Sequence, residues 1–383
     1  MDCCRHRRDN LNAEQQCVLD YLHWVTTFLN MRRVAHRSFR GAGSDRRALL
    51  YQLPALLDEP GSLTLVFSPL RALQRDQVQA LERRGVRSAL LNSDLSTFAH
   101  AAILRDFAAN GGHHYLAPEQ LRREDVCTTL AAAHVRRVVV DEAHILPQVE
   151  HAFRKDYRRI GPFIESLPKH PQVLAFTATA TCSDLNYIAE RLCMHDPKRL
   201  LFPIRRKNVK IYVKKITIRD KTGKTRKLQN ARLIMLDNVL RKYRKHGATI
   251  IYCPRVKDVK RTTKWLRSLD YPVKAYYGKM KRCKRAHVQD YFLTKKRPII
   301  VATNAFGLGI DAYTQKIGRA GRDGKKARAV LLYAPSDEYV VKNLIHSSRD
   351  PETVSRGKKR LKALKKVLRE PNKVWKGITK YFR

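Results

Sequence analysis

The segment Val138-Val-Val-Asp-Glu-Ala-His144 decides the fold. Its apolar part has the length of a buried strand, and two adjacent carboxylates, Asp141 and Glu142, follow it directly. Residues that follow a strand of a parallel sheet lie at its carboxyl edge, where ligands bind. At such an edge Asp141 can hold a magnesium ion through water, and Glu142 can orient or deprotonate a water that attacks a γ-phosphate. The segment favours a nucleotide-hydrolysing site over its alternative, a strand that runs into an acidic loop.

Short apolar runs alternate with helix-like stretches on both sides of this segment, which is typical of parallel sheets with crossover helices. In the first half we expect strands at 63–68, 87–91, 114–117, 135–140 and 172–177, and helices at 72–84 and 98–110. In the second half we expect strands at 211–213, 248–253, 272–276, 298–302 and 329–333, and helices near 231–245, 256–269 and 281–293. The sequence therefore predicts an α/β fold with two parallel-sheet domains in tandem.

We expect two further segments to flank these domains. The predicted order is an N-terminal helical segment at 1–33, a first domain at 34–203, a second domain at 204–345 and a basic helical tail at 346–383. From Arg356 the tail carries 12 basic residues against Glu370 alone. Leu361, Leu364 and Leu368 place an apolar stripe on it, so we expect one basic amphipathic helix there.

Charge is the most unusual feature of the composition. Lys and Arg number 78 against 34 Asp and Glu, which gives a formal net charge of +44. Self-repulsion of this size indicates a polyanionic partner such as nucleic acid, although a basic run can also be only a solvated face. A hydrophobic content of 43% disfavours disorder of the whole chain.

The remaining composition favours an intracellular protein. No apolar run approaches the roughly 18 residues that cross a bilayer, and the N-terminus has no secretory signal, so we expect no membrane partner. The eight cysteines contain no Cys-x-x-Cys pair, which favours reduced thiols. We expect the cytoplasm or nucleoid in a bacterium, or the nucleus in a eukaryote.

Three later stretches add phosphate chemistry. Phe176-Thr-Ala-Thr-Ala-Thr181 places hydroxyls at another strand end, and Phe306-Gly-Leu-Gly-Ile-Asp311 precedes Gln315-Lys-Ile-Gly-Arg-Ala-Gly-Arg-Asp-Gly324. In the last stretch, Arg319 and Arg322 are flanked by glycines, which suits positive charge delivered to a phosphoryl group. The alternative is a glycine-rich basic loop.

With these stretches in this order, the chain resembles RecQ-family DNA helicases of superfamily 2 from about residue 47 to its last residue. Tyr115-Leu-Ala-Pro-Glu-Gln-Leu121 and Phe153-Arg-Lys-Asp-Tyr-Arg-Arg-Ile160 favour this family over RNA helicases of the same superfamily. The resemblance implies two RecA-like domains of the P-loop NTPase type that close on ATP and Mg²⁺. It also implies stepping along a single strand with 3'-5' polarity, which unwinds duplex, branched or forked DNA in recombination and repair.

The resemblance assigns roles to individual residues. Asp141 would hold magnesium through water, Glu142 would act on the attacking water, and Arg322 would be the arginine finger with Arg319 beside it. The other implied positions are Arg47, Ala48, His144, Gly309, Asp311 and Gln315 for nucleotide binding, Ser68, Asn92, Phe153, Arg154 and Thr303 for DNA binding, and Thr177 and Thr179 for coupling hydrolysis to opening.

The chain also departs from the family pattern. A phosphate loop needs Gly-x-x-x-x-Gly-Lys-Ser/Thr, but Arg46, Arg47 and Ala48 stand where the second glycine, the lysine and the hydroxyl are expected. Asp311 is followed almost at once by Gln315, which leaves no room for a strand that normally separates those motifs. The family's zinc ligands are replaced by residues such as Val374, so we expect no structural zinc site.

Three interpretations therefore stay open. The first is a working DNA helicase with an aberrant phosphate loop. The second is a catalytically impaired helicase relic, or an imperfect gene model, that acts only as a nucleic-acid-binding protein. The third is an RNA-directed or restriction-type motor of the same superfamily, which the RecQ-like stretches disfavour. Protein partners, the preferred DNA structure and the oligomeric state are not predicted.

Overall fold

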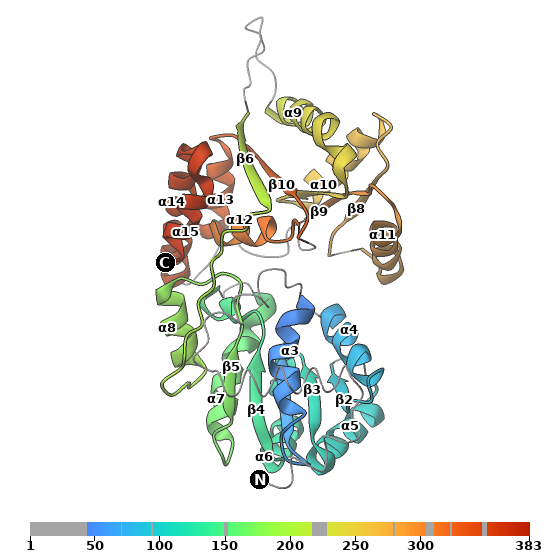
Figure 1. Ribbon diagram of the computed structural model, residues 1–383, viewed down its shortest axis with the longest axis vertical. Coiled ribbons are helices and arrows are strands. Elements are labelled where there is room, and N and C mark those ends of the chain that lie inside the picture. The colour runs from blue at the N-terminus through green and yellow to red at the C-terminus, as the bar shows by residue number, and fades with distance from the viewer. Residues whose placement is uncertain are drawn as a thin grey trace, which may run out of the picture. The chain divides into compact units, whose positions relative to one another are not determined.

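A computed structural model describes residues 44–69, 71–92, 95–148, 152–216, 228–278, 280–303, 310–321, 324–346 and 351–383. The chain divides into two compact units, one up to Arg206 with residues 321–325 and 379–383, the other at 207–320 and 326–378. Both units contain parallel strands and helices, so the predicted α/β fold with tandem parallel sheets is confirmed (Figure 1). The N-terminal helical segment predicted at 1–33 lies outside the described residues. In the part of the chain that is described, no helix has the length and apolarity to cross a membrane.

The first unit is built on a five-stranded parallel sheet with the order β2-β3-β1-β4-β5. Its strands are β1 (Leu63–Phe67), β2 (Ser88–Leu91), β3 (Gly112–Leu116), β4 (Val135–Val140) and β5 (Gln172–Ala175). Its α-helices are α3 (Ser44–Ala55), α4 (Arg71–Glu82), α5 (Thr97–Asn110), α6 (Glu124–Ala132), α7 (Ile160–Ser166) and α8 (Cys182–Arg191). Short 3₁₀ helices lie at η2 (Pro118–Arg122), η3 (Ala143–Gln148) and η4 (Ala152–Arg159).

Strand β1 shows how both faces of this sheet are covered. Its side chains alternate between the faces, so Leu65 and Phe67 join the large core with α5, α6 and α7. Val66 joins a smaller cluster with Ala48 and Tyr51 of α3, which Figure 1 shows lying over the strands. A strand buried on both faces has a continuous apolar sequence, and all of β1 is buried. This packing holds α3 against the strands that lead to the acidic segment.

Two predicted strand boundaries in the first unit are wrong by two residues. β3 begins at Gly112 rather than 114, because Gly112 adopts a φ of 113° and its N–H donates to the Ser62 carbonyl at 3.0 Å. β5 ends at Ala175 rather than 177, because the hydroxyl of Thr177 accepts from the Thr179 N–H at 3.2 Å and forms a turn. Glycine conformation and hydroxyl turns decide these ends, and apolar periodicity does not reveal either.

The second unit contains two separate parallel sheets. β6 (Val209–Lys215) pairs with β10 (Ala327–Tyr333), while β9 (Ile299–Thr303) lies between β7 (Thr249–Cys253) and β8 (Val273–Tyr276). The helices are α9 (Leu228–Tyr243), α10 (Val256–Arg267), α11 (Arg282–Thr294), α12 (Ile310–Ile317) and α13 (Asp337–His346), with η5 at Arg244–His246. Between β9 and β10 the described residues hold α12 and no strand. The sheets are therefore divided at the place where the sequence lacks room for a strand.

The prediction of one continuous tail helix is wrong. The tail forms α14 (Pro351–Arg369), η6 (Pro371–Lys373) and α15 (Val374–Tyr381). The break occurs because Pro371 has no N–H to donate and disfavours helical geometry in the preceding residue, and Glu370 has φ −116° and ψ 74°. Trp375 Nε1 donates to the Val209 carbonyl at 3.0 Å, so α15 packs against the start of β6.

Two neighbouring histidines of β3 give the first unit a testable pH dependence. His113 and His114 are 2% and 0% exposed, and burial lowers both pKa values, that of His114 to about 3. In the unfolded chain, these imidazoles bind protons below the ordinary histidine pKa of 6.5. In the folded chain, burial keeps them neutral to a lower pH. The contribution of His114 to stability is therefore full above pH 6.5 and is lost as the pH falls from there toward 3, and that of His113 falls in the same direction.

We expect the unfolding free energy to fall by up to about 1.4 kcal/mol per pH unit from His114 within that window. Urea unfolding followed at pH 7 and pH 5 measures this slope. His114→Gln should flatten the slope, whereas the exposed control His134→Gln should leave it unchanged. Equal slopes in all three proteins would contradict the prediction.

Candidate active site

The carboxyl edge of the first sheet brings the acidic segment beside two other strand ends. The Asp141 N–H donates to the Phe67 carbonyl at 2.9 Å, which aligns the ends of β4 and β1. The Phe176 N–H donates to the Val140 carbonyl at 2.9 Å, and the Ala143 N–H donates to the Phe176 carbonyl at 2.8 Å. These backbone bonds fix the acidic segment between the residues that follow β1 and β5.

A chain of polar contacts connects the acidic segment to the hydroxyl segment after β5. The Glu142 N–H donates to Asp141 Oδ1 at 2.9 Å, and Glu142 Oε2 lies 3.1 Å from His144 Nδ1. The same His144 nitrogen lies 3.2 Å from Thr177 Oγ1, and that hydroxyl donates to the Thr179 carbonyl at 3.2 Å. Five sequence-predicted positions, Asp141, Glu142, His144, Thr177 and Thr179, thus form one connected network.

Backbone geometry at Glu142 is unusual. Its φ is 52°, in the left-handed region that is costly for a residue with a side chain. Such conformations cost about 1–3 kcal/mol and cluster at active sites. Here the turn directs the carboxylate back toward the imidazole of His144. The carboxylate is 23% exposed, so water can still reach it.

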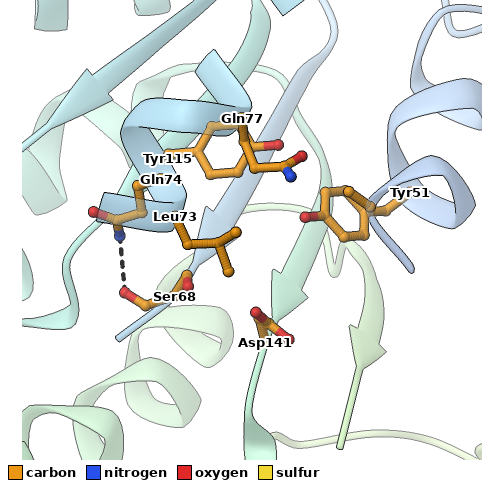
Figure 2. A pocket seen from close by; sticks show the side chains of 8 residues that line it. Tyr51, Ser68, Leu73, Gln74, Gln77, Tyr115 and Asp141 are labelled. Carbon is orange, nitrogen blue, oxygen red and sulfur yellow. Dashed lines mark hydrogen bonds between the residues drawn. The ribbon is translucent and has the colours of Figure 1, made fainter. Parts of the chain in front are cut away.

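A small pocket lies in front of Asp141. It is lined by Ala48, Tyr51, Ser68, Leu73, Gln74, Gln77, Tyr115 and Asp141, and Figure 2 shows these side chains converging from α3, α4, β3 and the strand ends. Gln52 Nε2 donates to Tyr115 Oη at 2.6 Å and to Gln77 Oε1 at 2.8 Å. Burial raises the pKa of Tyr115 to about 12, so the phenol stays protonated. The free space is about 10 Å³, which is room for about one water.

Only part of the pocket lining has the chemistry that suits a magnesium ion and a phosphate group. Ser68 Oγ and Gln74 Oε1 are buried without a hydrogen-bond partner, which suits a polar occupant next to the Asp141 carboxylate. Ala48, which also lines the pocket and is 2% exposed, presents a methyl group at the position where the family pattern has a metal-binding hydroxyl. Arg47 lies in the first turn of α3, and its side chain is outside the described residues.

Two of the predicted DNA-binding positions follow strands at this same edge. Ser68 follows β1 and Asn92 follows β2, and both side chains are almost fully buried. Gln74 Nε2 donates to the Ser68 carbonyl at 2.8 Å, which holds that strand end in place (Figure 2). Phe153 and Arg154 lie in η4, but the structure does not describe their side chains.

Comparison with known proteins identifies relatives over most of the chain. The DEAD/DEAH box helicase model matches residues 48–188, and the helicase conserved C-terminal domain model matches residues 231–312. The probable ATP-dependent DNA helicase RecS of Bacillus subtilis is 32% identical over 76% of this chain and 59% of its own length. The ATP-dependent DNA helicase RecQ of the same organism is 31% identical over 83% of this chain and 54% of its own length. The chain belongs to the RecQ-like DEAD/DEAH box helicases.

The structural comparison agrees on the fold of this RecQ-like chain. Saccharomyces cerevisiae Dbp5 bound to RNA and ADP BeF3 superposes with a TM-score of 0.58 at 16% identity, over 90% of this chain and 87% of that one. The predicted pair of RecA-like domains is thereby confirmed. The chain spans little more than half the length of the RecS and RecQ proteins that it matches.

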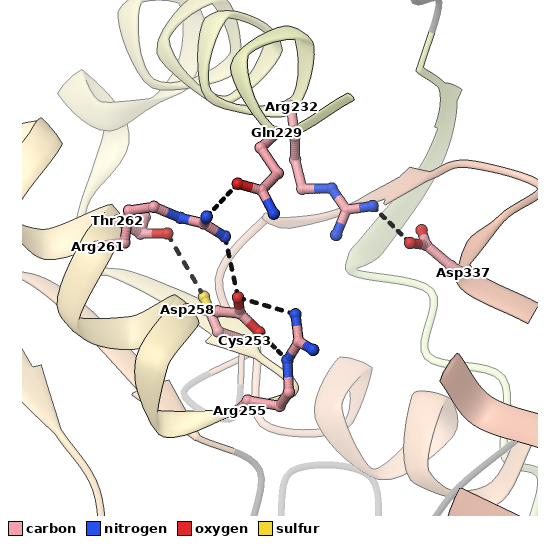
Figure 3. Close-up of polar contacts among 8 residues, drawn as sticks. All are labelled: Gln229, Arg232, Cys253, Arg255, Asp258, Arg261, Thr262 and Asp337. Carbon is pink, nitrogen blue, oxygen red and sulfur yellow. Dashed lines mark hydrogen bonds and ion pairs between the residues drawn. The ribbon is translucent and has the colours of Figure 1, made fainter. Parts of the chain in front are cut away.

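The second unit of the RecQ-like chain carries its own polar edge. Thr303 ends β9 in register with Cys253 at the end of β7. Beyond that edge Asp258 pairs with Arg255 at 2.8 Å and with Arg261 at 3.0 Å, as Figure 3 shows. The predicted DNA-binding threonine thus lies on the edge where a strand end leads into this arginine cluster.

Helix α12 holds two of the predicted nucleotide-binding positions, Asp311 and Gln315, and Arg319 follows it. Asp311 is 3% exposed, and one of its oxygens pairs with Arg360 of α14 at 2.6 Å. Asp311 is therefore held in an ion pair with α14 of the tail. Gly309 and Arg322 lie outside the described residues.

Sequence reasoning assigned no role to the buried amides of the pocket or to Tyr157. Gln52, Gln74 and Gln77 are each at most 7% exposed, and Tyr157 Oη donates to the Asp141 carbonyl at 3.3 Å. The spacing of Gln74 and Gln77 on one helix face was the available signal, because buried glutamines need partners. In the described residues no group of three His, Cys, Asp or Glu side chains is arranged to hold a metal ion.

Proposed function

We propose that the chain binds DNA and retains slow ATP-dependent helicase activity of the RecQ type with 3'-5' polarity. Its substrates would be single-stranded, duplex or forked DNA, and its role would lie in recombination and repair. The observation that carries the proposal is the connected network from Asp141 through Glu142 and His144 to Thr177. In this proposal, the network would activate the attacking water and would couple hydrolysis to the segment that follows β5.

The chain's own residues have defined tasks in this proposal. Asp141 would hold magnesium through water, and the ion would neutralise charge on the phosphates of ATP when bound. Glu142, partly exposed and held by His144, would accept a proton from water. Thr177 would transmit a shift of His144, because its hydroxyl contacts both that ring and the Thr179 backbone.

A catalytically impaired protein that only binds nucleic acid is the second candidate function. Two observations favour it: Ala48 provides no hydroxyl to the pocket, and the second unit has two separate sheets. A motor needs both units, so a weakened second sheet would reduce hydrolysis even where the first unit is intact. The two candidates differ in whether hydrolysis depends on Glu142.

Glu142→Gln separates the two candidates. The substitution keeps the size and hydrogen bonding of the side chain but removes its basicity, so DNA-stimulated ATP hydrolysis should fall by about 100-fold. Phosphate release with and without an oligo-dT strand measures this. Glu82→Gln, on an exposed residue at the end of α4, is the matched control and should retain full activity.

Absence of hydrolysis in the native chain, or hydrolysis that survives Glu142→Gln, would contradict the helicase proposal and favour binding alone. Polarity is tested separately on duplexes with a 3' or a 5' single-stranded tail. We expect separation of the 3'-tailed duplex and of forks. Stimulation by oligo-U in place of oligo-dT would instead favour the RNA-directed alternative.

A further inference from the structure

A second, larger hollow lies on the first unit, away from the pocket at Asp141. This groove has a volume of about 680 Å³ and is lined by Leu121, Arg122, Cys127, Lys155, Asp156, Arg158, Arg159, Pro162, Phe163 and Ser166. It is formed by η2, α6, η4 and α7, and it shares no lining residue with the active-site pocket. Its volume lies within the range of about 300–1,000 Å³ that is usual for ligand sites.

The groove carries more positive than negative charge. Four cations, Arg122, Lys155, Arg158 and Arg159, line it together with a single carboxylate, Asp156. Asp156 accepts from Arg122 Nε at 2.6 Å and from Nη2 at 2.9 Å, and Arg159 lies 3.4 Å away. The two arginine side chains are 60% and 54% exposed, whereas the Asp156 side chain is 11% exposed. The carboxylate thus orients two exposed guanidinium groups without neutralising the groove.

The floor of the groove is apolar. Pro162 is exposed and the Cys127 thiol is half-buried, so these two residues supply the accessible apolar surface, beside the buried Leu121 and Phe163. Among the lining residues the one aromatic ring, Phe163, is 4% exposed, so it offers no face on which a nucleic-acid base could stack. A sugar–phosphate strand would contact the basic rim, formed by Arg122, Lys155, Arg158 and Arg159, and would leave the apolar floor uncovered. A peptide with an aliphatic side chain flanked by carboxylates would contact both the floor and the rim.

We propose that this groove docks a short acidic peptide segment of a partner protein, with carboxylates on the arginine rim and an aliphatic side chain on the floor. Carboxylates pair with guanidinium groups through two parallel hydrogen bonds, and Arg122 already binds Asp156 in that geometry. Rim charges attract the segment, and the buried anchor side chain supplies specificity. The site concerns partner binding, and it is independent of ATP hydrolysis.

Direct binding of a designed peptide tests the proposal. The probe is a labelled nonapeptide that repeats Glu-Glu-Leu three times, followed by fluorescence anisotropy with the full chain at low salt. The variant is Lys155→Glu/Arg158→Glu, which reverses two exposed rim charges and leaves the Arg122–Asp156 pair intact. Arg83→Glu/Arg105→Glu is the matched control, because it makes the same charge change on two exposed residues, Arg83 directly after α4 and Arg105 in α5.

We expect the rim variant to bind the peptide at least about tenfold more weakly and the control to stay within about twofold of the native chain. Replacing Glu by Gln, or Leu by Ala, in the peptide should each weaken binding. Bound peptide should also slow alkylation of Cys127, read by mass spectrometry, without slowing alkylation of the exposed Cys182.

Three results would overturn the proposal. Equal loss of binding in the rim variant and in the control would mean general attraction to a cationic protein. Unchanged peptide binding in the rim variant, with thermal unfolding like that of the native chain, would exclude the groove. Weakened binding of oligo-dT with unaffected peptide binding would make the groove a nucleic-acid surface instead. DNA-stimulated hydrolysis and its dependence on Glu142 should be unchanged throughout.

Discussion

Raising the salt concentration from 50 to 200 mM will weaken binding of single-stranded DNA by a factor of about 300. The chain carries a net charge of +44, and binding that neutralises phosphates releases their counterions. Each contact on a single strand contributes roughly −0.7 to the slope of log K against log salt, so six contacts give a slope of about −4. Anisotropy titrations of labelled oligo-dT at four salt concentrations measure it. An affinity that hardly changes with salt would refute the prediction.

The structure shows which basic residues of the tail form ion pairs with the second unit and which are exposed, and only the exposed ones are expected to contribute to the salt dependence of DNA binding. Arg360 pairs with Asp311 at 2.6 Å, and Lys365 pairs with Glu338 at 2.7 Å, so both hold α14 on the second unit. Lys358, Lys359 and Lys362, in contrast, are exposed. Reversing these three lysines to glutamate should make the slope shallower by about 2 if they contact phosphates.

A matched variant shows whether that change is local. Reversing three exposed residues of the first unit, Arg83, Arg105 and Lys198, alters the net charge by the same amount. If the tail binds DNA, the tail variant should lose more affinity and more slope than this control. Equal effects would mean that the overall charge matters and that α14 has no particular role.

The fold of both units could be predicted because their strands are short runs of mainly apolar residues bounded by helical stretches. β4 and β7 were found in this way, within one residue of their bounds. Periodicity failed where a single residue decides an end, as Gly112 does for β3 and Pro371 does for the tail. The missing strand after Asp311 was also predicted from the sequence, and between β9 and β10 the described residues hold α12 and no strand.

Predictions of the site were limited to residues that lie in recognisable stretches. The acidic segment and Thr177 could be found because each follows a buried strand. The partner of Tyr115 could not be found, because Gln52 lies 63 residues away and glutamines occur on many exposed helices. Likewise, nothing in the local pattern around Arg360 indicates that it pairs with Asp311 instead of facing solvent.

The phosphate-binding side of the pocket is the part of the site that a substitution can repair. Ala48 and Asp141 line the same pocket, and the family pattern has a hydroxyl side chain at the position of Ala48. Ala48 is 2% exposed and packs near Tyr51, so a serine would add one oxygen to a buried position that lines the pocket. Arginine at position 47 keeps the charge of lysine but has a wider planar head, so the two are not equivalent in a tight phosphate cradle.

Restoring the pattern with Arg46→Gly/Arg47→Lys/Ala48→Ser should raise DNA-stimulated ATP hydrolysis by about 10²- to 10³-fold. The expected gain corresponds to roughly 2–4 kcal/mol of transition-state stabilisation by a charge and hydrogen-bond clamp. Steady-state phosphate release by the repaired and native chains measures it. The repaired chain carrying Glu142→Gln is the control, and it should lose the gain.

The outcomes of this experiment separate the causes of weak activity. A gain that Glu142→Gln abolishes would locate the defect in the phosphate cradle and leave the second unit competent. No gain, in a repaired chain that is folded and binds DNA, would locate the defect in the second unit. There β7 and β10 belong to different sheets, and Arg360 holds Asp311. Because the repair changes only the first turn of α3, it cannot correct that second defect, and the protein would then act through binding alone.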